Sequence, residues 1–210
     1  MIMKKILSVA LIGLSVAASA QVSLAGKANL IFPTGSPSWK NISNSAVAAY
    51  ENQGSNNVGF NFGLSLKIDL PLAFFLMPEV YYTTFKNEFT DPVSNTTFEV
   101  KNNRVDVPVL LGHRLIGNTL GVFVGPVASY NLAKEDSFND FVENAKNQFT
   151  IGYQFGAQIE LKSLLINAKY EGALSKDQRE FVRNVGGTDT ETIRYDNRAN
   201  LFMVGIGYKF

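Results

Sequence analysis

The chain has 210 residues, no cysteine and a formal net charge of +1. Without cysteine, neither a disulfide framework nor a lipid-modified cysteine is possible. A net charge this close to zero argues against a nucleic-acid partner, which would require a strongly basic surface.

The N-terminal segment is typical of a secretory signal peptide. A positive region at Lys4 and Lys5 precedes an apolar stretch from Ile6 to Val16, which is too short to cross a bilayer because crossing takes ~20 residues. An A-x-A cleavage site follows, formed by Ala18, Ala20 and the first mature residue, Gln21. We therefore expect residues 1–20 to be removed and residues 21–210 to form one exported domain.

Eight segments of the mature chain are predicted to be strands. In chain order they cover residues 22–32, 58–70, 74–86, 100–115, 119–130, 149–161, 164–175 and 202–210. Apolar residues alternate without a break over residues 58–70 and 149–161. These two runs are longer than the usual strand of ~5–6 residues and fit a tilted, membrane-spanning strand of ~9–11 residues.

The connections between these strands alternate between long and short. The long ones cover residues 33–57, 87–99, 131–148 and 176–196, and the short ones cover residues 71–73, 117–118 and 162–163. External loops and periplasmic turns alternate in this way in outer-membrane barrels. The predicted fold is all-β: an eight-stranded antiparallel transmembrane β-barrel, an up-and-down meander with both termini in the periplasm of a bacterial outer membrane. The long loops are expected to be solvated, with a short helix over residues 44–51.

A soluble barrel of the lipocalin type would alternate as well, with its apolar face inward. The less apolar face of this chain is rich in glycine: Gly59, Gly63, Gly121, Gly125, Gly152, Gly156, Gly205 and Gly207. Glycine weakens a strand and gains nothing from solvent, whereas a narrow lumen has use for missing side chains. The other face is bulky and aromatic, which favours the membrane barrel.

The last strand supports the same interpretation. Its apolar positions alternate up to an aromatic carboxy-terminal residue, a feature of closing strands in outer-membrane barrels. We expect Tyr208 and Phe210 to form the signal that the barrel-insertion machinery reads.

Charged residues fall on the inward face of the predicted strands. The predicted lumen charge network comprises Lys67, Glu79, Arg104, Asp106, Glu160, Lys169 and Glu171, and Lys27, Asp69, Arg114 and Lys209 share its phase. Unpaired charges in a narrow barrel would each cost several kcal/mol, so these side chains are expected to pair and to plug the lumen. A selective ion path is the rival interpretation.

Several motifs resemble those of the PorT-like family, small eight-stranded outer-membrane barrels common in Bacteroidetes. The matching segments are Met77-Pro78-Glu79-Val80-Tyr81-Tyr82, Asp106-Val107-Pro108-Val109-Leu110-Leu111, Gly125-Pro126 and Ala168-Lys169-Tyr170. Lys169 stands where an arginine is usual, and Asn103-Arg104-Val105 lacks the aromatic residue that often precedes the proline strand. The resemblance implies a structural barrel, and it does not imply a specific activity.

No catalytic, cofactor or metal site is predicted. The only histidine, His113, is expected on the lipid face near the periplasmic end, and the sequence implies neither a nucleophile nor an orienting carboxylate beside it. One histidine without cysteine leaves too few metal ligands. The leading hypothesis is a non-enzymatic barrel that acts through its external loops or as an accessory component of an envelope complex, for example in secretion. Its expected partners are outer-membrane lipid, the insertion machinery and an envelope protein. The alternatives are a lipid- or peptide-processing enzyme and a narrow channel for a small hydrophobic solute.

Overall fold

A computed structural model of the chain describes residues 21–34, 38–41, 51–53, 55–90, 97–132, 137–138, 141–145, 149–175, 178–184, 190–196 and 199–210. The predicted signal peptide lies outside the described residues, and its cleavage stays a prediction. No helix among the described residues is long and apolar enough to cross a membrane.

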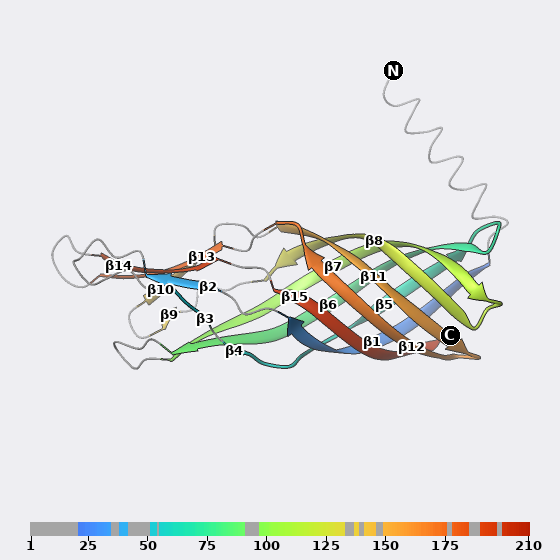
Figure 1. The fold of residues 1–210 in the computed structure, drawn as a ribbon, viewed down its shortest axis with the longest axis horizontal. Helices are drawn as coiled ribbons and strands as arrows, with labels where there is room; N and C mark the ends of the chain where they lie inside the picture. The colour runs from blue at the N-terminus through green and yellow to red at the C-terminus, as the bar shows by residue number, and fades with distance from the viewer. Residues whose placement is uncertain are drawn as a thin grey trace, which may run out of the picture.

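Eight antiparallel strands form a closed barrel (Figure 1). They are β1 (Val22–Thr34), β5 (Gly59–Asp69), β6 (Phe74–Thr90), β7 (Thr97–Ile116), β8 (Leu120–Asn131), β11 (Phe149–Leu161), β12 (Leu164–Ala173) and β15 (Asn200–Lys209). Each strand pairs with its predecessor and its successor in the barrel, and β1 pairs with β15 to close the ring. The predicted meander of eight strands is therefore confirmed.

The strands are strongly tilted. Paired residues, followed once around the barrel from Arg104, lead through Thr83, Asn61, Asn29, Gly205, Asn167, Gln158 and Gly121 to Arg114. The path thus returns to β7 ten residues further along the same strand. With strands ~4.8 Å apart and a rise of ~3.3 Å per residue, this shift corresponds to a tilt of about 40°. A barrel of this size has an interior that side chains fill.

The two ends of the barrel differ. Short turns join β5 to β6, β7 to β8 and β11 to β12 at one end, which we call the turn end, and the first residue of β1 and Phe210 lie there too (Figure 1). The long connections leave from the opposite end, which we call the loop end.

A second sheet lies beyond the loop end (Figure 1). Its six strands are β2 (Ser38–Asn41), β3 (Glu51–Gln53), β9 (Ser137–Phe138), β10 (Phe141–Ala145), β13 (Gln178–Asn184) and β14 (Thr190–Asp196), in the order β3-β2-β14-β13-β10-β9. A further short strand, β4 (Ser55–Asn56), pairs with β6. The prediction that the long connections are loops is therefore wrong for these described strands, and their solvation stays a prediction.

These strands are difficult to predict from the sequence because they are short and pair with strands of distant connections. Strand β2 of the first connection pairs with β14 of the fourth, and β13 of the fourth pairs with β10 of the third. Residues 87–90 and 97–99 also belong to strands, since β6 and β7 continue past the predicted barrel rim. Of the helix predicted over residues 44–51, all but Glu51 lies outside the described residues, and Glu51 begins β3.

The side chains predicted to face outward and inward on the strands do so around the barrel. Large apolar side chains such as Phe62, Phe155 and Ile206 are exposed on the outer wall, while Met203 and Lys169 are buried in the lumen. Proteins in water rarely expose so large an apolar surface, whereas the hydrocarbon core of a membrane accommodates it.

Glycines allow neighbouring strands to approach each other closely. A Cβ atom on Gly63 would lie 1.9 Å from the carbonyl oxygen of Val80 on β6, and one on Gly125 would lie 2.1 Å from that of Val109 on β7. Lumen space, the reason that the sequence suggests for these glycines, is thus only part of the explanation. At these two positions the adjoining backbone itself excludes a side chain.

The turn between β5 and β6 carries backbone strain that a substitution can relieve. Leu72 and Ala73 both have positive φ, of 58° and 61°, and the Phe74 N–H donates to the Pro71 carbonyl at 3.3 Å. These values define a type I′ turn, for which Asn-Gly is the favoured pair. We expect Leu72→Asn with Ala73→Gly to raise the free energy of unfolding by about 1–2 kcal/mol, because L residues are costly in the left-handed region.

Urea unfolding in lipid vesicles measures this change. The control is Asn118→Gly in the next turn, a position with negative φ, where no gain is expected. An equal gain in both variants would show that the left-handed strain is not the cause.

Candidate functional site: the barrel lumen

A group of charged and neutral polar side chains occupies the middle of the lumen, and we call it the central cluster: Lys27, Glu79, Tyr81, Gln158 and Lys169. The Glu79 carboxylate accepts from Lys27 Nζ and from Lys169 Nζ, each at 2.8 Å. Lys27 also donates to Gln158 at 2.7 Å, and Lys169 to the Tyr81 hydroxyl at 3.0 Å. Glu79 and Lys169 are only 3% and 1% exposed, so both ions depend on these bonds.

A second group lies nearer the loop end, and we call it the outer cluster: Thr83, Arg104, Asp106, Ser129, Gln154 and Glu171. Arg104 links both carboxylates, at 2.9 Å to Asp106 and 2.6 Å to Glu171. Neutral groups complete the bonding: Thr83 and Ser129 donate to Asp106, and Gln154 donates to Glu171. Each buried carboxylate thus has a cation and at least one neutral donor.

A third group lies at the turn end, the turn-end cluster: Lys67, Asp69, Arg114, Glu160 and Lys209. Glu160 accepts from Lys67 at 3.0 Å and from Lys209, and Arg114 lies 3.1 Å from Asp69. These side chains are partly exposed, so their pairs contribute less than the buried ones.

The charges of the two buried clusters complement each other. The central cluster holds two cations and one carboxylate, and the outer cluster holds one cation and two carboxylates. The excess positive charge of one therefore faces the excess negative charge of the other along the barrel axis, and the sum of the two is zero. The turn-end cluster adds three cations and two carboxylates.

Apolar side chains surround the charged layers. One buried cluster contains Ile31, Phe85, Ala199, Leu201 and Met203, and another contains Phe75, Met77, Leu110 and Phe123. A cavity of about 10 Å³ between the central and turn-end clusters has room for about one water molecule. In the described residues the lumen is thus occupied by protein side chains at several levels, which is the geometry of a plug.

The structure brings all seven residues of the predicted lumen charge network into the lumen, divided among the three clusters. Their inward phase on the strands made this placement predictable. Their division into three clusters was not predictable, because it depends on which strands lie opposite each other across the barrel. Sequence reasoning missed the neutral members Tyr81, Thr83, Ser129, Gln154 and Gln158. The signal was partly available, since Tyr81 and Thr83 share the inward phase of Glu79, and Gln154 and Gln158 share that of Glu160. Strand β8 has no charged residue, so only its inward glycines, Gly121 and Gly125, share the phase of Ser129.

His113 lies on the outer wall. Its ring packs edge-on against Phe74, with ring centroids 4.8 Å apart, close to the turn end. The prediction of a lipid-face position is confirmed. Among the described residues, no group of three or more histidine, aspartate or glutamate side chains is placed to hold a metal ion.

A closed meander barrel with an apolar wall and a charged, filled lumen defines a class of protein, the small outer-membrane barrels of bacteria. The chain belongs to the family described as outer membrane protein beta-barrel domain, whose model matches residues 20–176. In this class the turn end faces the periplasm and the loop end the cell exterior. No curated protein sequence matches the chain.

The solved structures that are similar in fold include two outer-membrane proteins. The outer membrane protein OprG from Pseudomonas aeruginosa has 15% identity and a TM-score of 0.58, with 90% of this chain and 95% of that chain covered. The outer membrane protein AlkL, determined in lipid bilayers, has 13% identity and a TM-score of 0.60, with 90% of each chain covered. At such identities the likeness concerns the fold alone.

Proposed function

We propose that the protein is a non-enzymatic barrel that presents its second sheet at the cell surface to an envelope or extracellular protein partner. The observation that carries this proposal is the second sheet itself, which joins strands from three separate connections into one surface. Ordering long connections costs conformational entropy, so an ordered surface there needs a reason. Binding residues are concentrated on connections that a rigid scaffold holds in place.

The lumen favours this proposal over the alternative of a narrow channel. Paired charges and two apolar clusters occupy it, and an eight-stranded barrel leaves little space beyond its side chains. Against the enzyme, His113 packs on Phe74 at the outer wall, away from the buried carboxylates. An accessory role in an envelope complex is one form of the proposal.

Replacement of the hairpin β13–β14, residues 178–196, with a short Gly-Ser linker tests the proposal. The hairpin supplies the two central strands of the second sheet, so its loss should abolish the surface and leave the barrel strands intact. We expect in-cell photo-crosslinking to yield a stoichiometric protein partner with the unmodified protein and none with the hairpin variant.

Heat-modifiable migration on gels controls for barrel assembly in both proteins. A second control shortens only residues 91–96, which connect β6 to β7, two strands that belong to the barrel sheet. Retention of the same partner by the β13–β14 variant, or the absence of any partner with the unmodified protein, would contradict the proposal.

A further inference from the structure

The charges of the three lumen clusters do not balance. Together the clusters hold six cations and five carboxylates. The outer cluster offsets the excess of the central cluster, so the unmatched positive charge belongs to the turn-end cluster. The α-carboxylate of Phe210 also lies at the turn end, but Phe210 is 75% exposed on the outward phase of its strand. Charges that are largely withdrawn from water need a counterion, and the protein supplies one too few.

A cavity lies where the positive charge is in excess. Its volume is about 10 Å³, it lies between the central and turn-end clusters, and it has room for about one particle of the size of water. Three lysines and one glutamate are among its lining residues, namely Lys27, Lys67, Lys209 and Glu160. Since the clusters on both sides of the cavity have an excess of cations, the local field favours an anion over a cation.

Hydrogen-bond donors are available on the cavity wall. Ser65 lines the cavity and is only 2% exposed, and its hydroxyl has no hydrogen-bond partner among the described residues. Lys67 and Lys209 each donate one hydrogen bond, to Glu160, so each ammonium group keeps N–H groups that are not used. Hydroxyl and ammonium donors are the groups that bind an anion most strongly.

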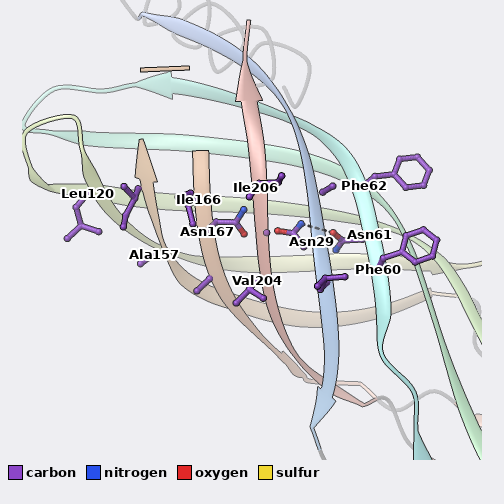
Figure 2. Close-up of a pocket in the computed structure, with 15 residues that line it drawn as sticks. Asn29, Phe60, Asn61, Phe62, Leu120, Ala157, Ile166, Asn167, Val204 and Ile206 are labelled. Carbon is purple, nitrogen blue, oxygen red and sulfur yellow. Dashed lines mark hydrogen bonds between the residues drawn. The ribbon is translucent and has the colours of Figure 1, made fainter. Parts of the chain in front are cut away.

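Protein side chains close the levels beyond the cavity. Lys27 uses all three of its ammonium protons in bonds to other buried side chains. One level further towards the loop end, the Asn29 amide donates to Asn61 at 2.6 Å, the bond that is dashed in Figure 2. An anion therefore enters the cavity from the turn end, where the lysines are partly exposed, and does not pass on along the lumen.

We propose that this cavity binds one chloride ion, held by the Ser65 hydroxyl and by the ammonium groups of Lys67 and Lys209. The ion supplies the single negative charge that the lumen lacks. A cation in the same place would meet three ammonium groups, and a water molecule would leave the excess charge as it is. Polyatomic anions are too large for a cavity of this volume.

Anomalous diffraction from crystals grown in sodium bromide tests the proposal, because bromide replaces chloride and is located directly. We expect an anomalous peak within hydrogen-bond distance of Ser65 Oγ in the unmodified protein. Ser65→Val removes the hydroxyl and fills the cavity, so its crystals should show no peak there. Thr150→Val is the matched control, since it removes a buried hydroxyl on β11 that does not line the cavity, and it should keep the peak.

Urea unfolding in lipid vesicles measures binding in solution. Chloride is raised about tenfold at constant ionic strength, with gluconate, which is too large for the cavity, as the replacement. The ratio of folded to unfolded protein should then rise by up to about tenfold, the limit for one ion that binds only the folded state. The same rise is expected for Thr150→Val, and none for Ser65→Val.

Three outcomes would overturn the proposal. Density in the cavity without an anomalous signal would identify the occupant as water. An anomalous peak combined with equal stability of the unmodified protein in chloride and in gluconate would indicate an adventitious ion only. An equal response to chloride in the unmodified protein and in Ser65→Val would place the responsible ion elsewhere. The first two outcomes concern the unmodified protein alone, so they decide the matter even if Ser65→Val does not assemble.

Discussion

Replacing Glu79 with glutamine is expected to lower the free energy of unfolding of the barrel by about 3–5 kcal/mol, the cost of leaving buried charges without a partner. Glu79 is the carboxylate between Lys27 and Lys169, each 2.8 Å away. Glutamine keeps the shape of the side chain and removes its charge, so two buried ammonium groups then face each other across a neutral amide.

The variant Lys169→Met should be less damaging, because Glu79 keeps its bond to Lys27. The expected loss is about 1.5–3 kcal/mol, the contribution of a hydrogen bond to a charged group. Tyr170→Leu, one residue further and on the outer wall, should cost less than about 1.5 kcal/mol, since hydrocarbon accepts either side chain. The variants are unfolded with urea in lipid vesicles, and the loss of heat-modifiable migration on gels gives a midpoint for each. These midpoints give the order of stability. If Tyr170→Leu is the most damaging of the three, the phase assigned to β12 is wrong.

Removing the whole charged group provides the complementary test. Lys27→Met, Glu79→Leu and Lys169→Met together remove all three ions of the central cluster and leave Tyr81 and Gln158 as its polar members. Replacing a buried ion group with apolar side chains is often neutral or stabilising. The triple variant should therefore be more stable than Glu79→Gln alone. A triple variant less stable than Glu79→Gln would show that packing, and not charge pairing, dominates in this cluster.

Replacing Gly63 with alanine is expected to destabilise the barrel by about 1–3 kcal/mol, or to prevent its assembly, because the added Cβ overpacks the wall. That atom would lie 1.9 Å from the Val80 carbonyl oxygen and 2.8 Å from the Tyr81 Cα. Backbone on a paired strand cannot move away as the tip of a flexible side chain can, so β5 and β6 must separate.

Gly26→Ala is the matched control for this change. A Cβ on Gly26 meets only the Phe210 ring, at an ordinary 3.7 Å. Both variants can be refolded from urea into vesicles and scored by the fraction of heat-modifiable protein. Equal folding yields for Gly63→Ala and Gly26→Ala would contradict the close approach of β5 and β6.

The barrel was predictable because its evidence is local and repeated. Apolar residues alternate without a break over residues 58–70 and 149–161, and the short turns at Pro71, Gly117 and Lys162 separate the strands at regular places. A one-residue error in phase would have turned Lys169 to the lipid and Tyr170 to the lumen, so the charges themselves fixed the inward face.

The second sheet was not predictable in the same way. Strand β2 pairs with β14, more than 140 residues further along the chain, and neither strand is long enough to show a clear period. The lumen gave an intermediate result. Phase identified Glu79 and Asp106 as inward, but the assignment of one to the central cluster and the other to the outer cluster depends on the tilt of the closed barrel.

Paired side chains and apolar clusters close the lumen. Single-channel recording of the purified protein in planar lipid bilayers, in concentrated potassium chloride, tests this closure most directly. With the buried Glu79 and Arg104 pairs and the apolar clusters in place, insertion should produce no conductance steps above background. Stable open-channel steps from the unmodified protein, in preparations whose folding heat-modifiable migration has verified, would contradict the account.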